Sequence, residues 1–375
     1  MSDIAPFHVM KLLARARQLE SEGRRIIHME VGEPDFDTPG CVKDAVTRAL
    51  AQNHTHYTHS LGDFALREEI CAYYHKMYQV AVEPDQVLVT SGTSPAMLLL
   101  FSVLLEKGDE VIVSDPHYAC YPNFIYFVQG CPVFVPVYEE DGFQYRPEEI
   151  KQKISKKTKA VFINSPSNPT GNLLSDARMK SIAALAPYIV SDEIYHGLVY
   201  EGRSRSILEF TDRAFVLNGF SKLFAMTGLR LGYLIAPKPF IRPMQKIQQN
   251  FFISANSIVQ KAGIAALREA DDDVAHMKTV YNERRKVMIK RLRKMNFGIT
   301  HEPTGAFYVF ANARHISEDS YRLAFDILEK AHVGVTPGID FGKNGEGYLR
   351  FSYANSMENI IEGMDRLEKY LDLRA

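Results

Sequence analysis

The chain has 375 residues, of which 46% are apolar and 24% charged, with a formal net charge of −1 and an isoelectric point near 6.9. This balance is that of an ordinary globular protein, and the length predicts a large domain together with a smaller one. A net charge so close to zero excludes a global field for nucleic acid or an anionic membrane, so any bound anion must be met by local groups.

The N-terminal stretch MSDIAPFHVMKLLARARQ is the first feature along the chain. It carries Asp3 and lacks the long apolar core of a secretion signal. The longest apolar run, AMLLLFSVLL at 96–105, has about half the length of a membrane span. The four cysteines show no Cys-x-x-Cys spacing and do not indicate a disulfide framework. We therefore predict a cytoplasmic protein with reduced thiols and no segment in a bilayer.

Short β-rich runs alternate with helical patterns through the middle of the chain. The expected strands are 86–91, 109–115, 160–164, 188–193 and 214–220, and the expected helices are 95–106, 121–130 and 176–186. This alternation predicts crossover units and a mostly parallel sheet with helices on both faces. In such α/β sheets, ligands bind at the carboxyl ends of the strands.

After Ala270 the pattern changes. Apolar residues at near-helical spacing predict a long amphipathic helix at 271–295, with the basic run from Lys286 to Lys294 as its solvated face. Strands are expected at 305–311, 333–338 and 347–354, followed by a helix at 357–373. We therefore predict a large domain at 41–270 and a small α+β domain formed by 1–40 with 271–375.

The segment Ser91-Gly92-Thr93-Ser94-Pro95 joins an expected strand to a strongly apolar helix. Thr93 or Ser94 suits the N-cap of this helix, and Pro95 suits its first position. Free N–H groups and the positive end of the helix dipole would then form an anion site. The alternative is a well-capped helix with nothing bound.

The stretch NGFSKLFAMTGLRLGY, at 218–233, is mostly small or apolar, which predicts burial, but it carries Lys222 and Arg230. Buried charges need partners, so an anion is expected there. A guanidinium suits bidentate phosphate recognition, and the Ser221 hydroxyl adds a donor; the alternative for Arg230 is a buried salt bridge. A partly desolvated lysine has a lowered pKa and can form an imine with an aldehyde, whereas a lysine after a strand is more commonly solvated.

Asp192 ends the expected strand YIVSD, and Tyr195 follows three residues later. A carboxylate at this position could hold a heterocyclic nitrogen in its protonated form. The alternative for Asp192 is a helix cap.

Together these motifs resemble the pyridoxal 5′-phosphate (PLP) enzymes of fold type I, and specifically the class I/II aminotransferases. The resemblance runs from about Met29 to the C-terminus. It rests on SKLFAMTGLRLGY (221–233), similar to the Schiff-base lysine segment; SPSNPTG (165–171), similar to the asparagine loop; SDEIY (191–195), similar to the pyridinium-aspartate strand; and YLRFSYA (348–354), similar to the carboxylate-binding arginine segment.

The resemblance implies a role for each matching residue around the cofactor. Lys222 would carry PLP as an imine and, once a substrate amine displaces it, move the proton between substrate carbon and cofactor. Asp192 would pair with the pyridinium nitrogen and keep the ring an electron sink. Tyr195 and Asn168 would hydrogen-bond the phenolic oxygen of the ring and lower the pKa of the imine, and Tyr118 would stack on the ring.

The resemblance also implies two anion subsites. The residues implied for the cofactor phosphate are Thr93, Ser94, Ser221, Arg230 and, from the partner subunit of a homodimer, Tyr57. Arg350 would clamp the substrate α-carboxylate, helped by the backbone of Gly32 and the side chain of Asn168. No metal is expected, because His54, His56 and His59 have no carboxylate or cysteine beside them.

The implied activity is a ping-pong transfer of an amino group from an L-amino acid to a 2-oxo acid. The segment from Phe7 to Met10 lies where the N-terminal segment of the family closes over substrate, and it carries no group for a second carboxylate. This favours neutral aliphatic or aromatic donors, with glutamate and 2-oxoglutarate as general partners. Two alternatives remain: PLP-dependent β-elimination by a C–S lyase, and an effector-binding regulator, for which the chain shows no basic stripe.

Overall fold

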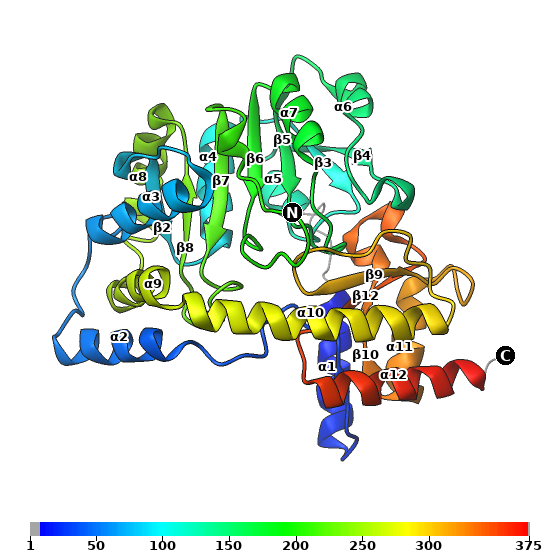
Figure 1. Ribbon diagram of the computed structural model, residues 1–375. Helices are drawn as coiled ribbons and strands as arrows, with labels where there is room; N and C mark the ends of the chain where they lie inside the picture. The colour runs from blue at the N-terminus through cyan, green and yellow to red at the C-terminus, as the bar shows by residue number, and fades with distance from the viewer. Residues whose placement is uncertain (1–7, 374–375) are drawn as a thin grey trace.

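Helices and strands alternate along the computed structural model, which describes residues 8–373 (Figure 1). The strands are β1 (Ile27–His28), β2 (Val87–Thr90), β3 (Glu110–Asp115), β4 (Cys131–Pro136), β5 (Thr158–Asn164), β6 (Tyr188–Asp192), β7 (Ala214–Gly219), β8 (Gly232–Ile235), β9 (Tyr308–Asn312), β10 (Val333–Gly334), β11 (Thr336–Pro337) and β12 (Tyr348–Ser352). The α-helices are α1 (His8–Ser21), α2 (Gly40–Ala51), α3 (Phe64–Tyr78), α4 (Thr93–Leu104), α5 (Tyr121–Phe127), α6 (Pro147–Lys153), α7 (Asp176–Leu185), α8 (Lys238–Phe251), α9 (Ser257–Glu269), α10 (Asp271–Lys294), α11 (Ser320–Ala331) and α12 (Met357–Asp372).

The central sheet has seven strands in the order β2-β8-β7-β6-β5-β3-β4. β8 runs antiparallel to both of its neighbours, and the remaining pairs are parallel. The expected mostly parallel, mixed sheet is therefore confirmed, although β4 and β8 were not predicted. Crossover connections bring the carboxyl ends of β3, β5, β6 and β7 to one edge of the sheet.

Side-chain alternation along the strands divides the apolar core between the two faces of this sheet. On β5, Ala160 and Phe162 pack in the cluster that contains side chains of α4, α5 and α8. Val161 and Ile163 pack in the cluster that contains side chains of α3 and α7. The strands are buried on both faces, which explains why they appear as continuous apolar runs.

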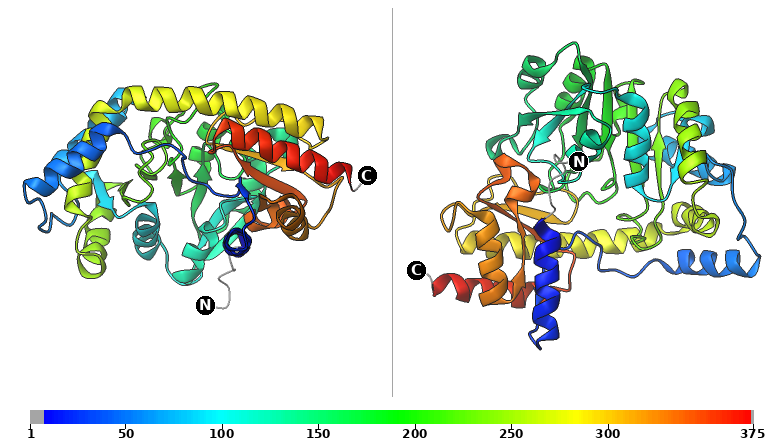
Figure 2. Two further views of the ribbon diagram at one scale, coloured as in Figure 1. Left: turned by 90° about the horizontal axis from the view of Figure 1, so that it is seen from below. Right: turned by 180° about the vertical axis from the view of Figure 1, so that it is seen from behind.

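A three-stranded antiparallel sheet, in the order β11-β12-β9, lies in the C-terminal third of the chain. N-terminal residues join this part, because β1 pairs in parallel with β10, and α1 contacts α11 and β11 (Figures 1 and 2). α10 contacts α9, β9 and α12, so it runs along both parts of the fold. The division into domains at 41–270 and at 1–40 with 271–375 stays a prediction.

α10 agrees with its expected pattern except at two arginines. Met288 and Leu292 are buried, and four basic residues of the run are exposed, namely Lys286, Lys290, Arg293 and Lys294. Arg284 and Arg285 are buried, although nothing in the sequence singled them out. Arg285 donates from Nη1 to the Pro303 carbonyl at 2.7 Å, which satisfies part of the buried guanidinium.

No helix within residues 8–373 is long and apolar enough to cross a bilayer. The four cysteines are free of disulfide bonds, and Cys131 is the exposed member of the set.

Candidate active site

A pocket of about 380 Å³ opens at the carboxyl ends of the central strands, beside the C-terminal sheet. It brings together eleven of the predicted site residues: Gly32, Thr93, Ser94, Tyr118, Asn168, Asp192, Tyr195, Ser221, Lys222, Arg230 and Arg350. Tyr57 does not line it. Its side chain is 85% exposed, so a cofactor contact from this residue requires a second subunit.

Lys222 follows β7 and projects into the pocket, as predicted. Its Nζ donates a hydrogen bond to the Gly32 carbonyl at 2.6 Å. Burial lowers the pKa of Lys222 to about 8; Glu33 opposes this shift, and Arg350 and Arg230 reinforce it. A substantial fraction of the amine is therefore neutral, and nucleophilic, in mildly alkaline solution.

Asp192, the last residue of β6, is held by two donors. Tyr121 Oη donates to Oδ2 at 2.6 Å, and the Ile194 amide donates to Oδ1 at 3.1 Å. Burial raises the pKa of Asp192 to about 6, while these bonds and Lys222 act in the opposite direction. A carboxylate with lone pairs left over, in a buried and nearly neutral setting, is suited to a cationic N–H donor such as a protonated ring nitrogen.

Tyr121 is a site residue that the sequence reading missed. It opens α5 as part of an apolar run, YPNFIYF, and nothing local separates it from an ordinary core tyrosine. Only the parallel pairing of the sheet, which brings the ends of β3 and β6 to one edge, places its hydroxyl against Asp192.

Arg350 lies on β12 and is almost fully buried, with 4% of its surface exposed. Nη1 donates to Asn168 Oδ1 at 2.8 Å, and Nη2 donates to the Glu30 carbonyl at 2.6 Å and to Thr336 Oγ1 at 3.1 Å. Nε is buried and has no hydrogen-bond partner in the described part of the chain. No carboxylate within residues 8–373 pairs with this guanidinium, so it is a buried cation suited to an incoming anion.

The contact with Arg350 also fixes the amide of Asn168. A guanidinium can only donate, so the atom that faces it is Oδ1, and Nδ2 becomes the donor that Asn168 can offer to a ligand. The backbone of Asn168 is held in turn by Asn164, whose Oδ1 accepts from the Asn168 amide at 2.8 Å.

The four residues expected to form a phosphate cup, namely Thr93, Ser94, Ser221 and Arg230, line this pocket together, but two expectations about them were wrong. Thr93 and Ser94 are the first residues of α4, and the N-cap is Gly92, without a side-chain cap bond; Pro95 is the third helical residue. The predicted serine or threonine cap was wrong because Gly92 adopts φ 96° and ψ 172°, and this turns the chain into the helix one residue earlier.

The second correction concerns Arg230. It was expected to be buried, but it is exposed, with Nη1 donating to the Thr227 carbonyl at 3.0 Å. It pairs with no carboxylate in the described part of the chain, so the alternative of a buried salt bridge is not observed. Glycine at 232 allows the backbone of this turn to approach Gly92 and Thr93, while the Arg230 guanidinium stays exposed beside Gly92.

We expect a Gly92→Ala variant to lose about 1–3 kcal/mol of stability, because this region of φ and ψ is accessible essentially to glycine alone. The new Cβ would also stand 2.5 Å from Arg230 Nη2 and displace it. Urea unfolding and cofactor titration would measure the two effects. Gly40→Ala, where φ is ordinary and a Cβ meets no atom within 4 Å, is the control; equal behaviour of the two variants would contradict the assignment.

The N-terminal helix supplies an apolar wall. Val9, Met10 and Leu13 of α1 line the pocket, and Phe7 lies outside the described residues. Asp340 anchors the start of α1, because its two carboxylate oxygens accept from the amides of His8 at 2.9 Å and Val9 at 2.7 Å. No local sequence pattern indicates this anchor, since the two partners are more than three hundred residues apart.

Comparisons with known proteins agree with this geometry. The sequence pattern of the family named aminotransferase class I and II matches residues 24–367. A (5-formylfuran-3-yl)methyl phosphate transaminase of Methanocaldococcus jannaschii is 41% identical over 98% of this chain and 97% of its own length. An aspartate aminotransferase of Pyrococcus horikoshii is 42% identical over 97% of this chain and 94% of its own. A solved Methanococcus jannaschii structure, described as similar in its active site to kynurenine aminotransferases, superposes with a TM-score of 0.92 at 41% identity and 98% coverage of both chains.

Proposed function

Since this chain belongs to the aminotransferase class I and II family and is an aminotransferase, we propose that it uses PLP to move an amino group from a neutral L-amino acid to a 2-oxo acid. One observation carries the proposal: the pocket brings together a lysine of lowered pKa, a buried aspartate and two arginines that pair with no carboxylate among residues 8–373. Such a set fits a ligand with a reactive aldehyde, a basic ring nitrogen and two separate anionic ends.

The residues present fit the cofactor. Lys222 would hold it covalently, Asp192 would pair with its ring nitrogen, and Tyr195 with the Nδ2 of Asn168 would donate toward its phenolic oxygen. Its phosphate would lie in the cup, and Tyr118 would cover its ring. When bound, the cofactor supplies an electron sink for the charge that develops at the substrate α-carbon. The residues proposed to bind the cofactor phosphate are Thr93, Ser94, Ser221 and Arg230, with Tyr57 of a partner subunit.

The chain's own groups then act on the substrate. Arg350 would hold the α-carboxylate, with the backbone of Gly32 and the side chain of Asn168 beside it. This orients the bond to the α-hydrogen toward Lys222, whose amine takes the proton and later returns it. The two half-reactions of an aminotransferase follow, with the amino group kept on the PLP-loaded protein between them.

Neutral donors are supported by the side chains that line the pocket. Within the described residues that line the pocket, the cations are Lys222, Arg230 and Arg350, each already assigned. The α1 side chains that face the pocket are apolar. A second substrate carboxylate against them would lose hydration without a partner, which costs several kcal/mol. Glutamate and 2-oxoglutarate remain proposed as general partners.

The remaining proposals are a homodimer with shared sites and a cytoplasmic location. The dimer rests on the exposed Tyr57, and sedimentation that shows a fully active monomer would refute it.

A donor panel tests the proposed function. We expect the purified chain, supplied with PLP, to absorb visible light, and its spectrum to change when an L-amino acid is added without an acceptor. Neutral aromatic and aliphatic donors should exceed aspartate in kcat/KM by about tenfold or more, the least that an unpaired buried carboxylate would cost. Formation of 2-oxo acid in stoichiometry with acceptor consumption supports transfer. Pyruvate and ammonia released from a cysteine conjugate without acceptor would instead show the C–S lyase.

A further inference from the structure

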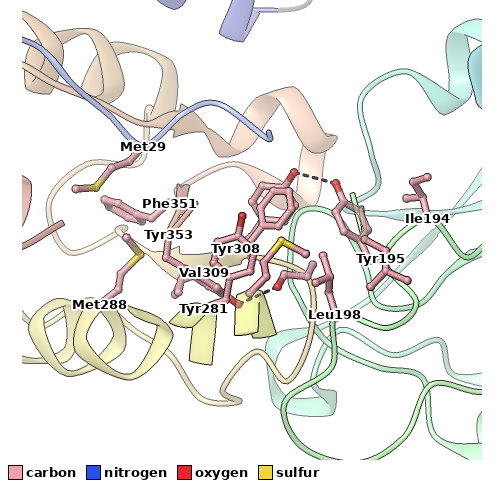
Figure 3. Packing of buried hydrophobic residues seen from close by; sticks show 14 of the residues in the cluster. Met29, Ile194, Tyr195, Leu198, Tyr281, Met288, Tyr308, Val309, Phe351 and Tyr353 are labelled. Atoms are coloured by element: carbon pink, nitrogen blue, oxygen red, sulfur yellow. Dashed lines mark hydrogen bonds between the residues drawn. The ribbon is translucent and has the colours of Figure 1, made fainter. Parts of the chain in front are cut away.

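Tyr195 and Tyr308 form a buried hydroxyl pair at the edge of the pocket. Their Oη atoms are 2.8 Å apart, and either could be the donor. Tyr195 follows β6 of the central sheet, and Tyr308 opens β9 of the C-terminal sheet (Figure 3). Both side chains are less than 5% exposed, and both line the pocket. The pair therefore joins the two sheets at the position where a ligand would lie.

The direction of this hydrogen bond decides what Tyr195 can do. A hydroxyl has a single proton to donate. If Tyr195 gave its proton to Tyr308, it could not also donate to the phenolic oxygen of a cofactor. We propose that Tyr308 is a positioning residue that donates to Tyr195, so that the proton of Tyr195 is directed to the phenolic oxygen of the cofactor. This inference rests on the proposed function.

Three features hold Tyr308 in place for this task. A side chain at position 32 would collide with the Tyr308 hydroxyl, so glycine at 32 allows the hydroxyl to sit against the backbone. The Arg350 guanidinium carbon lies 4.3 Å from the centre of the Tyr308 ring. Burial raises the pKa of Tyr308 and Arg350 opposes the shift, so the phenol keeps its proton near neutral pH.

The same arrangement connects two subsites. Arg350 lies over the face of Tyr308, and a substrate carboxylate bound to Arg350 would lie beside that ring. In a chain of two hydroxyls that ends on the cofactor, donation by Tyr308 polarises the Tyr195 hydroxyl and strengthens the hydrogen bond that Tyr195 donates. Within the described residues, the titratable groups whose charges act on the pair are Arg350 on β12, Tyr118 before α5 and Tyr121 on α5. Asp192 at the end of β6 and Lys222 after β7 line the same pocket.

The test is the pH titration of the visible absorbance of the PLP-loaded protein. Donation to the phenolic oxygen lowers the proton affinity of the Lys222 nitrogen. Loss of a donor must therefore raise the pH at the midpoint of the absorbance titration. We expect Tyr308→Phe to raise it by about half a pKa unit to one unit, the effect of one ordinary hydrogen bond. Tyr195→Phe should raise it further, and adding Tyr308→Phe to Tyr195→Phe should change nothing more.

Tyr353→Phe is the matched control. Tyr353 is also a buried tyrosine beside β12, and its hydroxyl donates to the Ala306 carbonyl at 3.2 Å, outside the pocket (Figure 3). Tyr353→Phe should change the midpoint temperature of unfolding but leave the pH midpoint of the visible absorbance unaltered. The inference alone would be overturned if the wild type shows the visible band but Tyr308→Phe leaves its pH midpoint unchanged. It would also be overturned if Tyr308→Phe raises the midpoint equally with and without Tyr195→Phe. A wild-type protein that gains no visible band would overturn the proposed function as well.

Discussion

A Lys222→Ala variant should lose amino-group transfer by roughly 10⁴-fold or more, because one residue supplies both the covalent attachment and the proton transfer. Lys222 is the one lysine among the described residues that line the pocket, so no other amine there can substitute for it. The cofactor should still bind, through the phosphate cup and Asp192, but borohydride should no longer fix it to the protein. Steady-state rates and mass spectrometry of the reduced protein measure the two effects.

Two matched variants separate chemistry from charge. Lys222→Arg keeps a cation in the pocket but cannot form the covalent bond, and it should be as inactive as the alanine variant. Lys238→Ala, on an exposed helix start where Nζ contacts Glu83, should leave transfer unchanged. A Lys222→Ala protein that still transfers amino groups at near wild-type rates would refute the proposed role of this lysine.

The pKa of Lys222 adds a pH dependence to the same experiment. Only the neutral amine attacks an aldehyde, and the folded, cofactor-free protein holds this pKa at about 8 rather than at the usual 10.5. The rate of covalent cofactor attachment should therefore rise with pH through about 8 and level off above it. A rate that kept rising toward 10.5 would show that burial does not lower this pKa in solution.

The site was predictable from sequence to the extent that its residues follow strands. In a parallel sheet, the residue that ends one buried strand lies beside the residue that ends the next, so Asp192 and Lys222 could be brought together before any coordinates were known. Arg350 was placed by resemblance alone. The roles proposed for these residues stay predictions, while their shared position in one pocket is observed.

The residues that the sequence did not reveal act through contacts between distant segments. Tyr121 and Tyr308 lie in apolar runs typical of a core, and only the sheet pairing turns their hydroxyls toward Asp192 and Tyr195. The prediction that Arg230 is buried was wrong for a related reason. Composition reports how apolar a segment is, but not whether the side chain at its turn lies beneath the surface or at the mouth of a pocket.

The final prediction concerns Arg350. Replacing it with alanine should lower kcat/KM for L-amino acids by about 10²- to 10³-fold, because truncating one partner of a buried, hydrogen-bonded charge pair costs several kcal/mol. The diagnostic comparison is the primary amine that has the same side chain but no carboxylate. It should react slowly with the wild type and nearly as slowly with the variant, so the preference for the amino acid should collapse by a similar factor.

Structural damage must be separated from lost recognition, since Arg350 also holds Asn168 and the Glu30 carbonyl. Thr336→Val removes one bond to the same guanidinium, at 3.1 Å, without removing the charge, and it should lower kcat/KM only several-fold. Cofactor affinity should change little in either variant, because neither residue belongs to the proposed phosphate cup. An Arg350→Ala protein that still prefers the amino acid over the amine by the wild-type factor would show that the α-carboxylate is bound elsewhere.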